Sequence, residues 1–581
     1  MAGKLLEVNN LTIGFPTQDG IRNVVDGISF FMRPGEIVGI VGESGSGKSM
    51  TVQRIMGLKV PDAVASGEIL FDGKDLMKLT TEEMMKIQGN DMSMIFQEPM
   101  TSLNPVKKIG WQVAESLKVH TELPDAEINE RVLNVLEGVG LHHPEILVEK
   151  YPHQLSGGMR QRVMSAMAMI CWPKLLIADE PTTALDVTVQ AQILQLLQKI
   201  HLEANTGILF ISHDLNVIKE ICQRVIVMYK GKIVEQGFTD DVMYHPKHEY
   251  TKHLVASIPK NKQDMRTDEN VMEAKHLDVF YNVKANGLFG KRENKHILQD
   301  ISFNIKRGEI LGLVGESGCG KSTMAKCIVG LNKNYKGELI VNEKYPQMVF
   351  QDPYSSLNPM KKIGWIMEEP LKIHGMKDKA KRRALVKDML EQVGLDETYM
   401  DRYPSELSGG QRQRISIGTA MILNSKFIIA DEPVSALDVT VQSQVMNLLL
   451  KMHREHHLTY LFISHDLNIV REFCNRIIVM YLGEIVEEAE VDDIYGDPKH
   501  PYTQLLFHSI LTDKRKMSKI TDREQRRIDS GREGCPFYGR CTSRLDICKT
   551  KRPDRYNINA EGQAPHFVKC FRYAEEYKDT L

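Results

Sequence analysis

Several common features are missing from this sequence of 581 residues. It has no run of about 18–20 consecutive apolar residues, which is the length that a membrane-spanning helix needs. Its first residues lack the apolar region of a secretory signal. Neither sign of charge is in excess, because 74 lysines and arginines face 76 aspartates and glutamates. We therefore expect a cytoplasmic protein, unless a partner holds it at a membrane, and no nucleic-acid partner.

Cysteine is also scarce, and it is unevenly distributed. The chain has nine cysteines, as is normal in a reducing compartment. Four of them fall close to the C-terminus, at Cys535, Cys541, Cys548 and Cys570. No paired Cys-x2-Cys motif occurs among them, so a zinc ribbon is poorly supported. Four thiolates suit an iron–sulfur cluster or zinc, and free structural thiols are the third interpretation.

The chain does contain a set of motifs that occurs twice in the same order. Each set has a Gly-x4-Gly-Lys-Ser loop, a Leu-Ser-Gly-Gly element, an Ala-Asp-Glu-Pro element and an Ile-Ser-His-Asp element. Length alone predicts about three to four domains, and the repeat refines this to two nucleotide-handling domains and a tail. We expect the first domain at residues 1–260, a linker at 261–271, the second domain at 272–511 and a C-terminal segment at 512–581.

Each glycine-rich loop follows a strand pattern and precedes a helical pattern, which is the P-loop arrangement. Backbone N–H groups hold a triphosphate there, so glycine is needed where a side chain would block the anion or where φ is positive. The lysines are expected to reach the β- and γ-phosphates, and the serine hydroxyls that follow them to ligate Mg²⁺. The nucleotide-binding residues predicted in the loops are Gly42, Ser44, Gly45, Ser46, Gly47, Lys48, Ser49 and Met50 in the first copy, and Gly315, Ser317, Gly318, Cys319, Gly320, Lys321, Ser322 and Thr323 in the second.

Two acidic residues end an apolar strand pattern in each copy. Asp179 and Asp431 are expected to bind Mg²⁺. Glu180 and Glu432 follow them and would act as general bases on the attacking water. Solvated strand-end acids would be the simpler interpretation if no P-loop lay upstream. Glutamines that position water and metal, and histidines that contact the γ-phosphate, are predicted at matching offsets: Gln97, Gln351, His213 and His465.

The Leu-Ser-Gly-Gly element places a serine and two glycines before a helix, which makes a second anion-binding N-terminus. One domain does not need two phosphate cradles for a single nucleotide. The economical interpretation is that each element contacts the γ-phosphate held by the other copy. The residues concerned are Ser156, Gly157, Gly158, Ser408, Gly409 and Gly410.

The complete motif set resembles that of the ATP-binding cassette (ABC) ATPases over almost the whole chain. This resemblance implies two α/β P-loop domains, each with a RecA-like core, an antiparallel β subdomain and a helical subdomain, that pair head to tail around two ATP molecules. It also implies that Phe15 and Tyr281 stack on adenine, although a core position on a strand face is the alternative for both. Asp186 and Asp438 match loops that communicate across the dimer.

Local features narrow the resemblance to peptide importers. Residues 97–105 and 351–359, residues 245–251 and 497–503, and the cysteine tail are similar to the two ATPases that drive bacterial dipeptide and oligopeptide import, here fused in one chain. The resemblance implies two membrane permeases, an external binding protein and a place on the cytoplasmic face of the membrane. It also favours a [4Fe–4S] cluster over zinc in the tail. Import of glutathione, nickel or metal chelates is one alternative, and a soluble ABC ATPase acting on ribosomes or DNA is another; export is a third.

The two copies are not equal in length. Residues 48 to 97 span 49 positions, whereas the matching residues 321 to 351 span 30. We therefore expect the second domain to have lost a peripheral strand or loop. The segments 97–155 and 351–407 are expected to be mainly helical.

Overall fold

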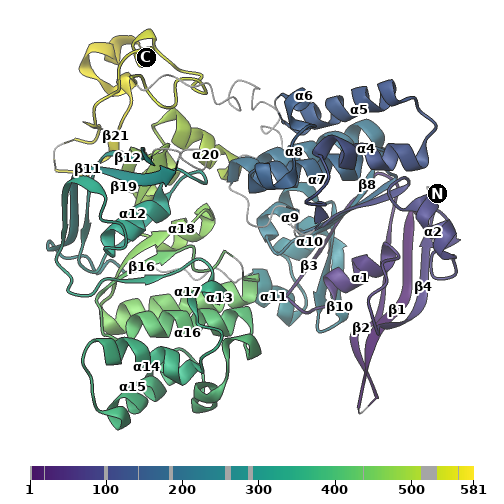
Figure 1. Cartoon of the computed structure of the whole chain (residues 1–581), viewed down its shortest axis with the longest axis horizontal. Coiled ribbons are helices and arrows are strands. Elements are labelled where there is room, and N and C mark those ends of the chain that lie inside the picture. Colours follow the sequence, from purple (N-terminus) through teal and green to yellow (C-terminus); the bar gives the residue numbers. More distant parts are fainter. Residues whose placement is uncertain are drawn as a thin grey trace. The chain divides into compact units, whose positions relative to one another are not determined.

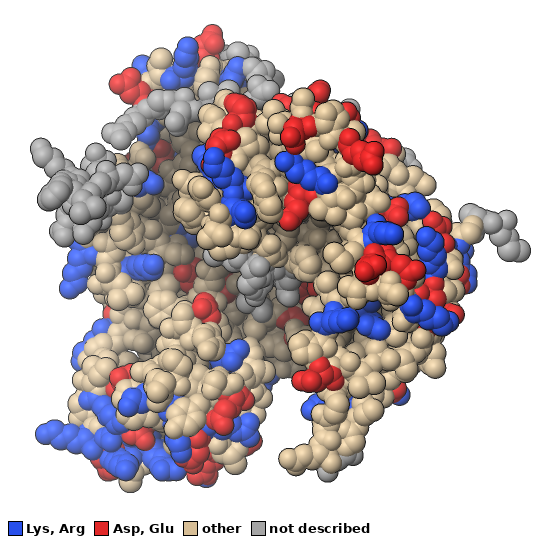
Figure 2. Space-filling model, turned by 45° about the vertical axis from the view of Figure 1, so that its right-hand side comes forward, with Lys and Arg blue, Asp and Glu red and all other residues tan. Residues whose placement is uncertain are grey.

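The computed structural model describes residues 3–18, 20–96, 102–141, 143–181, 187–255, 263–284, 292–435, 437–511, 533–560 and 562–580. The chain divides into two compact units, which are described separately here (Figure 1). The first unit comprises Met1–Ser257 with Asp438–Thr440, and the second comprises Ile258–Leu437 with Val441–Leu581. Acidic and basic side chains intermix over the face that Figure 2 shows, in line with the small net charge.

The first unit contains two sheets. Its core sheet has the strand order β10-β9-β3-β8-β7-β6, in which all neighbours are parallel except β10 and β9. A four-stranded antiparallel sheet has the order β2-β1-β4-β5. The strands are β1 (Leu6–Thr17), β2 (Gly20–Met32), β3 (Ile37–Gly42), β4 (Val64–Phe71), β5 (Lys74–Asp75), β6 (Met92–Ile95), β7 (Leu175–Asp179), β8 (Gly207–Ile211), β9 (Arg224–Tyr229) and β10 (Lys232–Phe238).

Helices surround the core sheet and form a separate helical part of the first unit. The helices are α1 (Lys48–Ile55), α2 (Thr81–Ile87), α4 (Ile109–His120), α5 (Asp125–Gly138), α6 (Pro144–Leu147), α7 (Gly157–Met169), α8 (Val187–Ala204), α9 (Leu215–Ile221), α10 (Thr239–Tyr244) and α11 (Glu249–Val255). The helical character predicted for residues 97–155 is confirmed by α4, α5 and α6. Residues 97–101 lie outside the described part of the chain.

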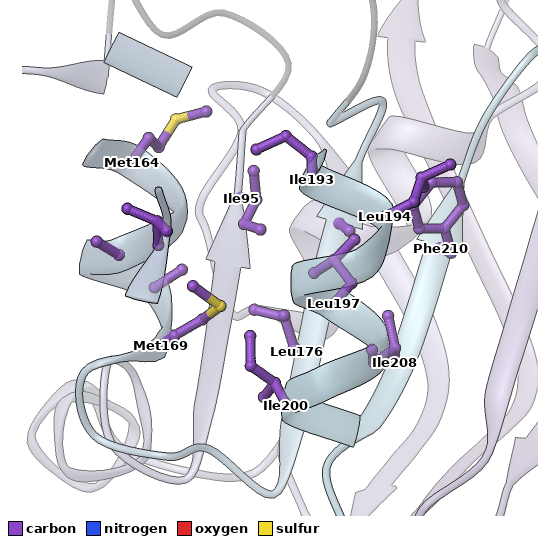
Figure 3. Packing of buried hydrophobic residues seen from close by; sticks show 14 of the residues in the cluster. Ile95, Met164, Met169, Leu176, Ile193, Leu194, Leu197, Ile200, Ile208 and Phe210 are labelled. Atoms are coloured by element: carbon purple, nitrogen blue, oxygen red, sulfur yellow. The ribbon is translucent and has the colours of Figure 1, made fainter. Parts of the chain in front are cut away.

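Helix α8 shows how the first core is assembled. Ile193, Leu197 and Ile200 recur at helical spacing on one face and are almost completely buried. They pack in one cluster with Leu176 of β7 and Ile208 of β8 (Figure 3). Burial of each such side chain stabilises the folded state by about 1.5–3 kcal/mol, because its apolar surface is removed from water. The predicted site residues lie at the carboxyl ends of the parallel strands. These strands are therefore held in place by the closely packed hydrophobic layer between the sheet and α8.

The second unit repeats this plan. Its core sheet has the order β15-β16-β17-β13-β18-β19-β21-β20, and an antiparallel sheet has the order β12-β11-β14. The strands are β11 (Asn270–Lys284), β12 (Arg292–Lys306), β13 (Ile310–Val314), β14 (Tyr335–Val341), β15 (Gln347–Val349), β16 (Phe427–Asp431), β17 (Thr459–Ile463), β18 (Arg476–Tyr481), β19 (Glu484–Glu490), β20 (Tyr556–Asn557) and β21 (Phe567–Val568). The helices are α12 (Lys321–Ile328), α13 (Pro353–Ser356), α14 (Ile363–Ile373), α15 (Lys379–Gln392), α16 (Gly409–Met421), α17 (Val439–His456), α18 (Leu467–Phe473), α19 (Val491–Gly496) and α20 (Pro501–Leu511). The predicted α/β fold with antiparallel β and helical parts is confirmed, and so is the helical character of residues 351–407.

The difference in length between the copies has a clear structural cause. In the first unit β5 and α2 lie between β4 and β6 along the chain. In the described part of the second unit, β14 leads to β15 without either element. The segment predicted to be lost is therefore a helix together with a short strand.

The C-terminal residues 533–580, called the cysteine module below, belong to the second unit. Figure 1 shows this segment in yellow beside α20 and β19. Its strand β21 pairs antiparallel with β19, and β20 pairs with β21, so the module adds two short strands to the core sheet. It also contains the 3-10 helices η5 (Asp546–Lys549), η6 (Phe571–Tyr573) and η7 (Glu575–Thr580). Among the described residues, none of the helices has the length and apolar character needed to cross a bilayer.

Candidate nucleotide-hydrolysis sites

Each glycine-rich loop connects the central strand of a core sheet to a helix. In the first unit, β3 ends at Gly42 and α1 begins at Lys48. Gly42 has a φ of 153°, and a Cβ there would lie 2.1 Å from the carbonyl oxygen of Met228. Gly315 has a φ of 150°, and its Cβ would lie 2.2 Å from the oxygen of Met480. The first glycine of both loops is therefore required by the close approach of the neighbouring strand.

The loop lysines are buried against the loop backbone. Lys48 Nζ donates hydrogen bonds to the carbonyl oxygens of Gly42 at 2.7 Å and Glu43 at 2.8 Å. Lys321 Nζ donates to Gly315 at 2.6 Å and Glu316 at 3.1 Å. Burial lowers the pKa of Lys48, although nearby carboxylates oppose this shift. Both loops thus hold an ammonium group where an anion would enter.

The strand-end aspartates lie beside the loop serines. Asp179 ends β7, is buried, and lies with Oδ1 3.4 Å from Ser49 Oγ. Burial, assisted by the charge of Glu180, raises the pKa of Asp179 to about 6. Asp431 ends β16, and its buried Oδ1 has no hydrogen-bond partner in the part of the chain that the structure describes. Carboxylate and hydroxyl oxygens are the ligands that Mg²⁺ prefers, so both sites fit this ion.

A glutamate and a histidine face each other in each unit. Glu180 and Glu432 have φ values of 48° and 49°, which is uncommon for residues other than glycine. Their carboxylates lie 3.2 Å and 3.1 Å from Nδ1 of His213 and His465 respectively. Gln351 Nε2 donates to the Glu432 carboxylate at 2.8 Å, whereas Gln97 lies outside the described residues.

The pair in the second unit stabilises the charged form of both partners. Burial would raise the pKa of Glu432, but the hydrogen bond and charge of His465 outweigh it, and the pKa lies below its usual value. Burial would lower the pKa of His465, yet the contact with Glu432 raises it. Burial would also lower the pKa of His213, and the contact with Glu180 raises it in the same way. An ionised glutamate is the state that a general base requires.

The Leu-Ser-Gly-Gly elements lie at helix N-termini. Ser156 caps α7, and its Oγ accepts a hydrogen bond from the Met159 N–H at 3.3 Å. Ser408 caps α16 in the same way with Gln411, also at 3.3 Å. The N–H groups of the glycines that follow begin each helix, where backbone donors and the helix dipole favour an anion.

Other predicted residues are distributed as follows. Phe15 on β1 and Tyr281 on β11 are half-buried. Met50 and Thr323 lie in the first turns of α1 and α12. Asp438 immediately precedes α17. Asp186 lies outside the described residues.

Sequence reasoning missed two tyrosines that support the phosphate loops. The hydroxyl of Tyr250 accepts a hydrogen bond from the Glu43 N–H at 3.1 Å. The hydroxyl of Tyr502 accepts one from the Glu316 N–H at 2.9 Å. Both tyrosines belong to the repeated Pro-Lys-His-x-Tyr-Thr segments, and their equal separation from His213 and His465 along the chain was the available signal.

The four C-terminal cysteines line one cavity, together with Phe537 and Arg572. Burial raises the pKa of Cys535 to about 12 and that of Cys570 to about 11, so these two thiols are protonated at neutral pH when no metal is bound. Within the described residues, no three histidine, cysteine, aspartate or glutamate side chains are arranged to hold a single metal ion.

The two loops, each with a strand-end acid pair, a facing histidine and a serine-capped glycine helix, define a tandem P-loop nucleoside triphosphatase. Residues 25–183 and 298–435 match the ABC transporter family. Residues 234–278 and 486–548 match the C-terminal region of oligopeptide/dipeptide transporters. The chain therefore belongs to the ABC transporter family, and it is an ATPase coupled to transport.

Its similarity to individual proteins extends over most of the chain. It is 44% identical over 522 residues to the peptidoglycan transport ATP-binding protein YejF of Agrobacterium fabrum, covering 87% of this chain and 96% of that protein. It is 40% identical over 559 residues to the glutathione import ATP-binding protein GsiA of Escherichia coli K12, covering 88% and 90%. Among solved structures, the ADP- and phosphate-bound dimer of the cassette MJ0796 is 28% identical and covers 40% of this chain and 98% of its own, with a TM-score of 0.38.

Proposed function

We propose that this chain is the ATP-hydrolysing subunit of a bacterial importer for dipeptides or oligopeptides, bound at the cytoplasmic face of the membrane to two permease subunits. An extracytoplasmic binding protein would deliver the substrate. The observation that carries the proposal is the presence of two ATPase cassettes together with the oligopeptide/dipeptide C-terminal region in one chain. We call the first unit the first cassette and the second unit the second cassette.

The catalytic roles form part of this proposal. Lys48 and Lys321 would bind the β- and γ-phosphates of ATP. When bound, Mg²⁺ would neutralise charge on the phosphates. Its predicted ligands are Ser49, Gln97 and Asp179 in the first site and Ser322, Gln351 and Asp431 in the second. Glu180 and Glu432 would each accept the proton of the attacking water, with His213 and His465 holding each glutamate in its ionised form.

The head-to-tail pairing of the cassettes is also a proposal. It rests on the resemblance and on the presence of a second anion-binding helix in each cassette. The Ser156 helix would complete the second nucleotide site, and the Ser408 helix would complete the first. ATP would favour the closed pair, and hydrolysis would release it.

Replacing the two glutamates tests the catalytic assignment. Glu180→Gln and Glu432→Gln should each lower ATP turnover about 10²–10⁴-fold, because the proton acceptor is lost, while ATP binding remains. Turnover is measured as phosphate release, and binding by nucleotide titration. A variant that turns over at the wild-type rate would exclude that glutamate as a base that drives transport.

Purification from membranes tests the importer assignment. Capture of the tagged chain after gentle extraction should recover two polytopic permeases in equal amounts. ATP turnover of the recovered complex should then rise with a peptide-loaded binding protein. Stimulation by glutathione or a metal chelate alone would replace peptide as the substrate. Recovery of ribosomes or DNA-repair proteins would move the chain to the soluble class.

We further propose that Cys535, Cys541, Cys548 and Cys570 hold a [4Fe–4S] cluster. Their convergence on one cavity supports this proposal. Anaerobically purified protein should contain about four iron atoms per chain, and Cys548→Ser should lower this content. One zinc per chain would favour zinc, and neither metal would leave structural thiols.

A further inference from the structure

An arginine of the cysteine module reaches into the second phosphate loop. Arg540 Nη1 lies 2.8 Å and 3.1 Å from the two carboxylate oxygens of Glu316, the second residue of that loop. The side chains of Arg540 and Glu316 are only 5% and 7% exposed. Charged groups buried to this degree are rare unless they are paired, so the contact is a built feature of the cassette.

Glu316 is a central residue of its loop. Its N–H donates to the Tyr502 hydroxyl, and its carbonyl oxygen accepts hydrogen bonds from Lys321 Nζ and from the Cys319 N–H. The ion pair with Arg540 fixes the side chain of the same residue. A displacement of Glu316 would therefore move the lysine that is expected to bind the phosphates.

Arg540 is itself firmly placed. It lies 5.6 Å from the ring centroid of Phe537 and 5.7 Å from that of Tyr481. The N–H groups of Arg540 and Cys541 both donate to the Phe537 carbonyl oxygen at 3.0 Å. This turn is bracketed by Cys535 and Cys541, so the position of the arginine depends on the folded cysteine module.

The first cassette has the same loop without this contact. The Glu43 N–H donates to the Tyr250 hydroxyl, and the Glu43 carbonyl accepts from Lys48. Its side chain is half-exposed, however, and within the described residues it forms no ion pair with a lysine or arginine. Two regions match the C-terminal region of oligopeptide/dipeptide transporters. The region that follows the second cassette's motifs, residues 486–548, extends into the cysteine module, whereas the region in the first half of the chain, residues 234–278, includes none of the four C-terminal cysteines.

We propose that Arg540 is a positioning residue of the second ATP site, which holds the phosphate loop through Glu316 and makes nucleotide affinity at that site alone depend on the cysteine module. The inference rests on the proposed ATPase function. It adds that the two sites of one chain differ in what supports them.

The test uses full-length chains in which only one loop binds. Lys48→Ala should abolish ATP binding at the first site, so that only the second site binds. Lys321→Ala should abolish binding at the second site, so that only the first site binds. In the Lys48→Ala background, Arg540→Met should raise the Kd for ATP about tenfold, or ~1.4 kcal/mol. In the Lys321→Ala background it should change the Kd less than twofold. Arg540→Lys keeps the charge but replaces the planar guanidinium by a shorter side chain with a compact ammonium group, and should restore part of the affinity.

Arg552→Met is the matched control. Arg552 also anchors the module, by contacts with Glu484 and Gln299, neither of which belongs to the loop. It should leave the Kd at the first site unchanged and change the Kd at the second site clearly less than Arg540→Met does. An equal effect of Arg540→Met in both backgrounds, an equal effect of Arg552→Met, or no effect would overturn the inference. Absence of ATP binding in the parent chains would instead overturn the proposed function.

A second pair of variants covers the case in which Arg540→Met does not fold. Glu316→Gln removes the charge that Arg540 contacts but preserves side-chain size and the backbone. Glu43→Gln makes the same change in the first loop. Glu316→Gln should weaken ATP binding several-fold at the second site, and Glu43→Gln less than twofold at the first. Equal effects would show that Arg540 has no special role.

Discussion

The two cassettes carry almost the same site geometry on sheets with different covering. The glutamate–histidine distances are 3.2 Å in the first cassette and 3.1 Å in the second. Yet six of seven residues of β19 are buried, whereas the matching strand β10 has no buried residue. The cysteine module covers β19 and contacts the second phosphate loop. Duplicated motifs therefore do not make equivalent sites, because the surroundings of a loop also fix its position.

The largest expected difference between the cassettes concerns Phe537. This ring is 3% exposed and packs 5.3 Å from Tyr481 and 5.6 Å from Tyr502, measured between ring centroids. Phe537→Ala should destabilise the second cassette by about 3–5 kcal/mol, through lost burial and an unfilled cavity. Hydrogen exchange should accelerate in β19 and α20 and stay unchanged in β10 and α11. Equal acceleration in both cassettes would contradict the local role of the module.

The first glycine of each loop should behave identically in both cassettes. Gly42→Ala would place its Cβ 2.1 Å from the carbonyl oxygen of Met228, and Gly315→Ala would place its Cβ 2.2 Å from that of Met480. Each should weaken ATP binding at its own site about 100-fold, or ~2.7 kcal/mol, because the loop must move away from the neighbouring strand. Binding is measured in the single-site backgrounds. A tolerated alanine in one loop would show that the loops differ in backbone position.

A half-buried glutamate gives the first cassette its own pH dependence. Glu220 on α9 has a buried Oε1 without a hydrogen-bond partner among the described residues, and burial raises its pKa to about 7. The unfolded chain ionises near the ordinary value of 4.5, so this group lowers stability progressively as pH rises from 4.5 to 7, and fully above 7.

Glu220→Gln should therefore stabilise the first cassette by up to about 2 kcal/mol above pH 7, and by almost nothing below pH 4.5. Denaturant unfolding followed by hydrogen exchange across this range measures the effect. Glu472→Gln, at the matching position of α18, corrects for removal of one acidic group. A stabilisation that does not vary with pH would contradict the assignment.

The supporting tyrosines should show the smallest difference. Tyr502 is fully buried, whereas Tyr250 is half-exposed. Tyr502→Phe leaves the Glu316 N–H without an acceptor and should cost about 1 kcal/mol, whereas water can replace the hydroxyl of Tyr250. Nucleotide affinity in the single-site backgrounds should therefore fall about fivefold for Tyr502→Phe and less than twofold for Tyr250→Phe. A larger effect of Tyr250→Phe would reverse the comparison.

The sequence was sufficient to predict the parts of this molecule that local spacing encodes. A strand, a glycine-rich loop and a helix within about 20 residues specify their own geometry, so the positions of Lys48 and Lys321 followed directly. The contact between Arg540 and Glu316 joins residues 224 positions apart. Nothing in the local pattern distinguishes this arginine from the other 73 basic residues. Its partner is fixed only when the module packs on β19.

The structure of the segment that the second cassette lacks could not be predicted from the sequence either. The number of missing positions follows from the shorter spacing between Lys321 and Gln351, but the sequence does not show that they form a helix and a short strand in the first cassette. Helix α2 is held in the first cassette by Met84 and Ile87, which pack in a core cluster with β1 and β4. Such long-range packing decides whether a short segment forms a helix, and local spacing does not report it.

The pairing of β21 with β19 has a consequence for synthesis of the chain. All elements of the first cassette have left the ribosome soon after residue 255 is added, so its loop and core can form early. The second cassette receives its last core-sheet strand only when Phe567 and Val568 emerge. At about 5–20 residues per second, this delay is roughly 15–60 seconds. A chain that ends after residue 322 but before Phe567 would carry a finished first loop and a second loop that the cysteine module does not yet support.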